Sequence, residues 1–122
     1  MRSEEPFIYG PSNGKPGVKY EFLFISNDPN DDDIMYYIEW GDSFTDQTDY
    51  NESGEPVTVS HTYNSQGTYI IRVRAIDSYG EESNWSFFTI VIPRNKAIIN
   101  SFFLQFLERF PLLKQLFTYF SL

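Results

Sequence analysis

Hydrophobic and polar residues alternate along four stretches of the first three quarters of this chain. One stretch runs from Val18 to Ile25, and a second runs from Ile34 to Trp40. The pattern returns from Thr68 to Ile76 and from Trp85 to Ile92. Because successive side chains of a strand point to opposite faces of its sheet, a period of two is typical of strands with one buried face. The pattern therefore predicts an all-β domain.

Turn-forming residues separate the predicted strands. Residues 6–17 hold three prolines and three glycines, which indicates an irregular edge strand followed by a turn. Residues 43–56 are polar and are expected to form a loop, and a short strand is expected from Pro56 to Tyr63. Together these elements make six or seven strands. Their alternation assigns to the core Val18, Tyr20, Phe22, Phe24, Ile34, Tyr36, Ile38, Trp40, Val57, Val59, Tyr69, Ile71, Val73 and Ala75.

The last thirty residues follow a helical pattern instead. Their apolar residues recur at intervals of three and four, which is the period of a helix with one apolar seam. Pro111 interrupts this seam and predicts a kink or two short helices. We therefore expect a β-sandwich over residues 1–92 and an amphipathic, Phe/Leu-rich helical tail over residues 93–122. The seam of the tail consists of Phe103, Phe106, Phe110, Leu113, Phe117 and Phe120.

Charge and composition narrow the classes of partner. Residues 1–92 hold 16 acidic and 5 basic residues, whereas residues 93–122 hold 4 basic residues and 1 acidic residue. An acidic body repels the phosphates of nucleic acids, so no nucleic-acid partner is expected. The chain has no cysteine, which excludes disulfides and thiolate metal sites but leaves the compartment open. Three of its first five residues are charged and no apolar segment follows them, so no signal peptide is predicted.

Four short motifs occur in a fixed order along residues 6–92. Together they resemble the polycystic kidney disease (PKD) domain family. That family usually has Gly-Asp-Gly at the end of the first motif, and here Ser43 replaces the last glycine. The resemblance implies an immunoglobulin-like β-sandwich of about seven strands, found on cell surfaces and beside secreted hydrolases. The start of the tail, residues 93–97, is similar to a C-terminal segment of archaeal surface proteins. The motifs are Trp40-Gly41-Asp42, His61-Thr62-Tyr63, Gly67-Thr68-Tyr69 and Ala75-Ile76-Asp77-Ser78-Tyr79-Gly80.

Two acidic loops form a candidate calcium site. Asp28, Asn30 and Asp32 lie on one turn, and Asp77 begins another loop that we expect at the same end of the sandwich. Calcium prefers six to eight oxygen ligands in flexible geometry, which such loops supply. The resemblance adds that some PKD domains bind calcium between equivalent loops. The alternative is a turn rich in Asp and Asn whose charges are simply solvated.

The sequence does not favour catalysis. His61 is the only histidine, and its neighbour Ser60 points to the opposite face of the same strand. Glu39 and Asp42 could suggest the paired acids of a glycosidase, but they lie on one strand and its turn with no cleft implied. We therefore expect no enzymatic activity, and we expect His61 and Tyr63 to organise the sandwich.

Alternation also predicts an apolar stripe on the outside of the sandwich, made by Met35, Tyr37, Ile70, Phe87 and Val91. Such a stripe could be covered by the tail, could bind a partner protein, or could bind sugar through Tyr37 and Trp85. The tail could dock on its own sandwich, associate with another chain, or lie on a membrane surface; charged residues interrupt it too often for a membrane span.

These features favour a non-catalytic cell-surface or secreted module for adhesion, spacing or assembly, with the tail as its docking or association element. An extracellular location would make the domain part of a longer precursor. The alternatives are a carbohydrate-binding accessory domain of a secreted hydrolase and a purely structural linker domain.

Overall fold

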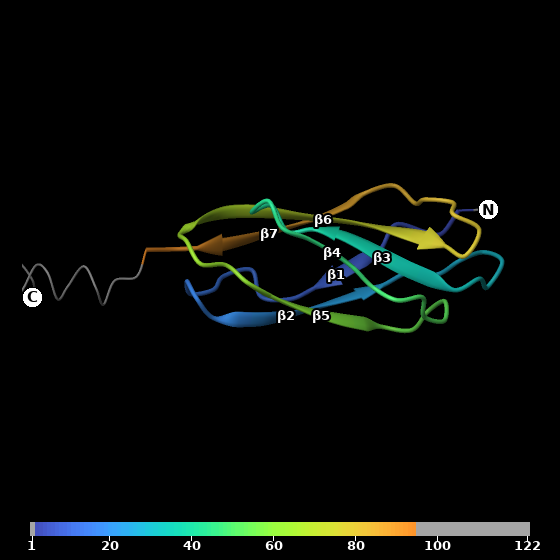
Figure 1. Ribbon diagram of the computed structural model, residues 1–122, viewed down its shortest axis with the longest axis horizontal. Coiled ribbons are helices and arrows are strands. Elements are labelled where there is room, and N and C mark those ends of the chain that lie inside the picture. The colour runs from blue at the N-terminus through green and yellow to red at the C-terminus, as the bar shows by residue number, and fades with distance from the viewer. Residues whose placement is uncertain (1, 95–122) are drawn as a thin grey trace, which may run out of the picture.

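The computed structural model describes residues 2–94, which form a sandwich of two antiparallel sheets (Figure 1). The three-stranded sheet has the order β1-β2-β5, and the four-stranded sheet has the order β4-β3-β6-β7. The immunoglobulin-like β-sandwich of about seven strands is thus confirmed, whereas the helical tail predicted for residues 93–122 falls outside the described residues from residue 95 onward. The strands are β1 (Phe7–Tyr9), β2 (Lys19–Ile25), β3 (Ile34–Glu39), β4 (Thr45–Gln47), β5 (Val57–Thr62), β6 (Gly67–Asp77) and β7 (Ser86–Ile92).

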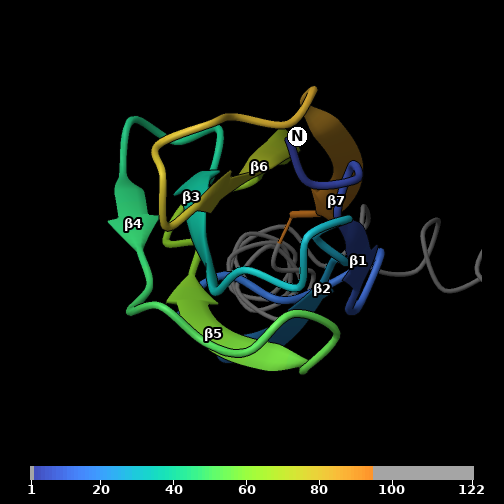
Figure 2. The same ribbon diagram turned by 90° about the vertical axis from the view of Figure 1, so that its right-hand side faces the viewer.

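The core lies between the two sheets, and the view along the sandwich shows the sheets enclosing it (Figure 2). Trp40 is its largest fully buried side chain, with ring centroids 5.4 Å from Phe22 and 6.2 Å from Phe24. The residues assigned to the core by alternation are buried or packed against the core, with one exception. Val18 is 41% exposed because it belongs to the turn before β2, where its N–H donates to the Lys15 carbonyl.

The prediction of a loop over residues 43–56 was wrong for β4. All three residues of β4 are exposed, so no alternation of buried and exposed positions marks the strand. The strand forms because its backbone pairs with the edge of β3, placing Gln47 opposite Tyr37 and Thr45 opposite Glu39. A short edge strand of polar residues carries no periodic signal in its sequence.

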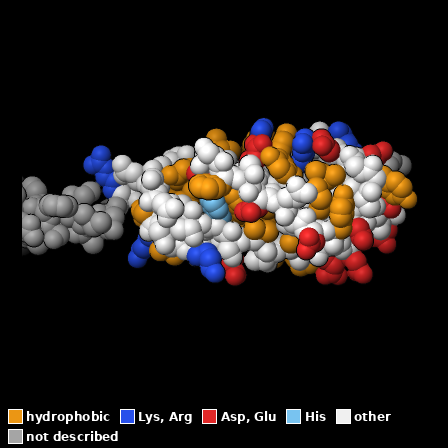
Figure 3. All heavy atoms as spheres, in the orientation of Figure 1, with side chains coloured by type: hydrophobic (Ala, Val, Ile, Leu, Met, Phe, Trp, Pro, Cys, Tyr) orange, Lys and Arg blue, Asp and Glu red, His pale blue; other side chains and the backbone are white. Residues whose placement is uncertain are grey.

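The described part of the chain is elongated, and its two ends lie at opposite poles. Figure 1 shows the N-terminal residues at one pole and the end of β7 at the other. The loops that join β2 to β3 and β6 to β7 share the pole of the N-terminus. Acidic side chains gather at that same pole (Figure 3). Within residues 2–94 there is no helix with the length and apolarity that crossing a membrane requires.

Gly41 occupies a position suited to glycine. Its φ is +88°, and a Cβ atom there would lie 2.7 Å from the Ile70 carbonyl oxygen of β6. Gly17 also has a positive φ of +78°, but a Cβ atom there would have nothing within 4 Å. Gly41 therefore combines left-handed backbone with close approach to a neighbouring strand.

We expect Gly41→Ala to lower the free energy of unfolding by about 2 kcal/mol, because a left-handed alanine costs about 1 kcal/mol and displacing β6 costs about as much again. Gly17→Ala is the matched control and should cost only about 1 kcal/mol, because it lacks the steric contact. Urea unfolding of both variants measures the difference. Equal losses would show that the approach to Ile70 does not constrain residue 41.

Candidate functional site

Three carboxylates meet at the acidic pole of the sandwich. Asp28 and Asp32 come from the loop between β2 and β3, and Asp77 is the last residue of β6. One oxygen from each lies within 4.8 Å of the others. Asp28 and Asp77 are buried, and Asp32 is half-buried. The fold thus brings Asp77 to two carboxylates that lie 45 and 49 positions before it in the sequence.

Asp28 is held by a network of hydrogen bonds. Its Oδ2 accepts from Ser3 Oγ at 2.9 Å, and its Oδ1 accepts from the backbone N–H groups of Asn30 at 2.9 Å and Asp32 at 3.2 Å. Burial alone would raise the pKa of Asp28, but these hydrogen bonds outweigh it and hold the pKa below its ordinary value. Asp28 is therefore a fixed, ionised carboxylate.

Asp77 is fixed in a similar way by the loop that follows β6. Its Oδ1 accepts from the backbone N–H groups of Tyr79 and Glu81, each at 2.9 Å. This is the geometry of a turn built around an Asp side chain. The carboxylate is almost completely removed from solvent, so its charge faces Asp28 and Asp32 rather than water.

Asp32 is the unsatisfied member of the group. Its Oδ2 is buried and has no hydrogen-bond partner. Burial raises the pKa of Asp32, and the charges of Asp28 and Asp77 raise it further. A buried carboxylate oxygen that faces two other carboxylates without a donor is costly, and a cation would remove that cost.

The donor set suits a hard cation. Calcium binds oxygen at about 2.3–2.6 Å, so two of its ligands can lie up to about 5 Å apart, and the spacing of these three oxygens falls within that limit. The three residues offer oxygen and neither nitrogen nor sulfur, which does not suit zinc. The residues present therefore fit calcium better than a transition metal.

The sequence placed the other predicted ligand, Asn30, on the same turn. In the structure Asn30 is exposed, and its backbone N–H donates a hydrogen bond to Asp28. The contact that links Asn30 to the carboxylates is thus made by its backbone. Sequence reasoning did not find Ser3, whose hydroxyl reaches Asp28 across 25 residues. No spacing rule links the two positions, since the contact depends on how the N-terminal segment lies on the sandwich.

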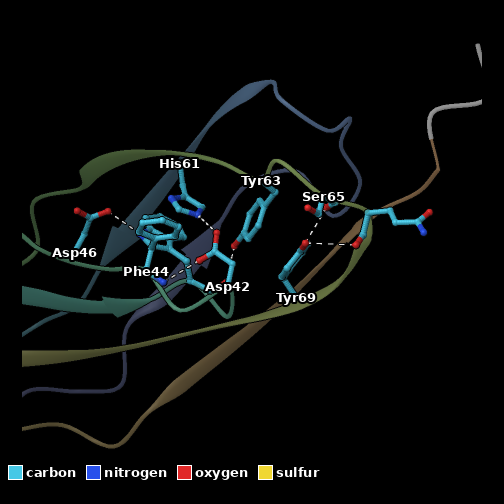
Figure 4. Close-up of polar contacts among 9 residues, drawn as sticks. Asp42, Phe44, Asp46, His61, Tyr63, Ser65 and Tyr69 are labelled. Carbon is cyan, nitrogen blue, oxygen red and sulfur yellow. Dashed lines mark hydrogen bonds and ion pairs between the residues drawn. The ribbon is translucent and has the colours of Figure 1, made fainter. Parts of the chain in front are cut away.

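His61 of β5 forms a second polar centre with the turn that follows β3 (Figure 4). Its Nε2 lies 2.6 Å from Asp42 Oδ2, and its ring stacks on Trp40 at a centroid distance of 4.5 Å. Tyr63 packs edge-on against the same ring and donates its hydroxyl hydrogen to the Trp40 carbonyl at 2.7 Å. The His61 side chain is only 12% exposed. This arrangement orders the turn after β3 around a core residue.

The outer face of the four-stranded sheet carries the five residues of the predicted apolar stripe. Ile70 is 56% exposed and Phe87 is 64% exposed, and Val91 is also exposed. Thr89 pairs directly with Ile70, so Phe87 and Val91 flank that pair on the same face. We call Ile70, Phe87 and Val91 the apolar patch.

Met35 and Tyr37 lie farther along this face and are half-buried. The Tyr37 ring lies 6.1 Å from the Trp85 ring, and the guanidinium groups of Arg72 and Arg74 lie 4.2 and 4.5 Å from the centre of the Trp85 ring. Cation–π contacts therefore already occupy the aromatic pair that had suggested sugar binding.

Comparison with known proteins places this architecture in a family. A family model for the PKD domain matches residues 7–90. The structure is similar to the PKD domain of an M14-like peptidase from a Thermoplasmatales archaeon, with a TM-score of 0.75 and 41% sequence identity over 77% of this chain and 98% of that one. No match was found among curated proteins. The family match and the shared sandwich together show that this chain belongs to the PKD domain family.

Proposed function

We propose that this domain is a non-catalytic spacing and assembly module of an extracellular or cell-surface protein. The observation that carries the proposal is the position of the two ends of residues 2–94 at opposite poles of an elongated sandwich (Figure 1). A domain built in this way holds whatever adjoins its two ends at a set separation. PKD domains are modules that often occur in extracellular proteins, which agrees with this role.

Contacts at the acidic pole support the proposal because they hold the N-terminal segment to the body. The Glu4 N–H donates to the Asn27 carbonyl at 2.9 Å, and Ser3 donates to Asp28. Arg2 donates to the Asn84 side chain at 3.2 Å. The chain therefore enters the sandwich from a defined position rather than through a free linker.

Calcium would strengthen this attachment. In the proposed role, Asp28, Asp32 and Asp77 bind one calcium ion that joins the loop after β2 to the loop after β6. Ser3 is hydrogen-bonded to one of these ligands, so the ion would also stiffen the N-terminal segment. The buried, unpartnered oxygen of Asp32 supports this assignment.

Distance measurements between two spin labels test the spacing role. The chain has no cysteine, so the double variant Glu4→Cys and Arg94→Cys can be labelled at both poles of the full chain. We expect a single narrow distance distribution in the presence of calcium, because the backbone of Glu4 pairs with Asn27 and Arg94 lies two residues after the end of β7. Removal of calcium is expected to broaden this distance distribution, because the segment that holds Glu4 would lose the support of the ion.

The matched control carries labels on two strands, through Thr58→Cys on β5 and Thr89→Cys on β7. Both residues are exposed and lie inside strands, so their distribution measures the width contributed by the labels alone. The spacing role would be ruled out if, in calcium, the distance distribution between residues 4 and 94 were much broader than that of this control.

A second candidate is an accessory domain of a secreted hydrolase, and the similarity to a domain of an M14-like peptidase favours it. Carbohydrate binding is a weaker form of this candidate, because a sugar stacked on Trp85 would have to displace Arg72 and Arg74. Retention of the protein on polysaccharide beads would support carbohydrate binding. In either candidate the tail serves as the docking or association element.

A further inference from the structure

The apolar patch leaves three hydrophobic side chains in water along the outer face of β6 and β7. Phe87, Ile70 and Val91 are exposed by 64%, 56% and 38%. Beside Ile70 the same face has a depression of about 390 Å³, which extends to Phe44. Phe44 is itself 66% exposed. Exposed apolar side chains that gather on one face of a sheet are typical of a contact site.

The segment that follows β7 is in position to cover this surface. Val91 lies one residue before the end of β7, so the chain leaves the sheet beside the patch. The ten residues 93–102 can extend over about 33 Å, whereas the patch from Val91 to Phe87 measures about 13 Å along the strand. The connecting residues are therefore long enough to reverse direction and return over the sheet.

The apolar pattern of the following residues matches the patch in length. Phe103, Phe106 and Phe110 precede Pro111 and would span about 10 Å on one side of a helix. The two parts of the chain carry net charges of opposite sign, but the acidic side chains of the sandwich gather at the other pole, and Arg72 lies beside Ile70. The length of the segment and its place directly after β7 are therefore what favour a segment of this chain over a separate protein as the occupant.

We propose that residues 103–110 of the same chain dock on the apolar patch, with Phe103, Phe106 and Phe110 packed against Ile70, Phe87 and Val91. The docked segment covers the outer face of β6 and β7 near the pole at which the chain leaves the sandwich. This inference deepens the proposed role of the tail as an association element by naming the surface to which it binds.

Limited trypsin digestion of the full chain tests the docking. Arg109 lies within the docked segment, so cleavage after it should be slow in the parent protein. Phe87→Glu places a charge in the centre of the patch and is expected to accelerate this cleavage about tenfold or more, because the apolar contact that protects the site is lost.

Phe7→Glu is the matched control. Phe7 is 63% exposed, nearly the same as Phe87, and it lies on β1 in the opposite sheet. The docking proposal expects no change in cleavage after Arg109 in this variant. Thermal melts should show that both variants remain folded, since Phe87 and Phe7 both lie outside the core of the sandwich. Fast cleavage in the parent, or equal acceleration by both variants, would overturn the proposal.

A nitroxide at Thr89→Cys separates docking in one chain from exchange between chains. Thr89 lies between Phe87 and Val91 on β7, and its side chain is exposed. Docking within one chain predicts that the label broadens the NMR signals of residues 103–110 and that dilution with unlabelled protein leaves the broadening unchanged.

Broadening that appears on isotopically labelled chains mixed with spin-labelled ones would assign the patch to a second copy. Absence of broadening, with binding of residues 103–110 to anionic vesicles, would assign the segment to a membrane surface.

The outcome is independent of the spacing role. The distance between Glu4 and Arg94 depends on the sandwich alone, since both residues precede the docked segment. If docking failed while the distance between Glu4 and Arg94 stayed narrowly distributed, only the docking proposal would be rejected. If docking succeeded while that distance was broadly distributed, only the spacing role would be rejected.

Discussion

Replacing Trp40 with alanine is expected to destabilise the sandwich by about 3–5 kcal/mol, which is a large part of the stability of a domain of this size. Trp40 is fully buried, contacts both Phe22 and Phe24, and stacks on His61. Alanine would leave a cavity that the two sheets cannot close without moving. Equilibrium unfolding in urea, followed by circular dichroism, measures the loss.

Phe44→Ala is the control for this prediction. Phe44 also contacts the His61 ring, at a centroid distance of 6.2 Å, but 66% of the residue is exposed. Its removal should change the free energy of unfolding by no more than about 0.5 kcal/mol. A loss for Trp40→Ala that is no larger than the loss for Phe44→Ala would mean that Trp40 does not support the core.

Calcium is expected to raise the melting temperature of this domain substantially. At a free calcium concentration of about 100 times Kd, one ion bound only by the folded state stabilises it by about 2.7 kcal/mol. For a domain of this size that corresponds to a rise in Tm of about 10–20 °C. Thermal melts in calcium and in a chelator measure the rise, and magnesium at the same concentration tests whether the site requires the larger ion. Identical melts in calcium and chelator would contradict the proposed site.

Asp32→Asn should have opposite effects in these two conditions. Without calcium it removes a charge that faces Asp28 and Asp77, and the raised pKa of Asp32 reflects that unfavourable placement, so Tm should rise. With calcium it removes a charged ligand, so most of the calcium response should disappear. Asp33→Asn changes the net charge by the same amount at an exposed neighbour and should keep the calcium response. Loss of the response in both variants would indicate general charge screening instead of a site.

Alternation predicted the fold because the core of a sandwich depends on a period that the sequence displays directly. The residues from Ile34 to Trp40 illustrate this, since every second side chain is buried. The same reasoning missed β4, whose residues 45–47 are all exposed, and misplaced Val18, which lies in a turn. Those two features depend on backbone pairing and turn geometry, which leave no apolar period.

The candidate site shows a similar division. The acidic turn and Asp77 could be proposed as ligands from residue type, because calcium prefers carboxylate and amide oxygens. The contribution of Ser3 could not, because its bond to Asp28 follows from the path of the N-terminal segment. The pairing of His61 with Asp42 was likewise hidden, since it joins β5 of one sheet to the turn that follows β3 of the other.

The placement of the first and last described residues at opposite poles has a mechanical consequence. A stretching force applied between the poles would act parallel to β7, whose seven residues are paired along their length with β6. Hydrogen bonds of an antiparallel pair lie perpendicular to the strands, so this force loads the bonds in shear and together instead of opening them one after another. A domain under tension in this direction should therefore resist extension until the whole β6–β7 ladder gives way at once.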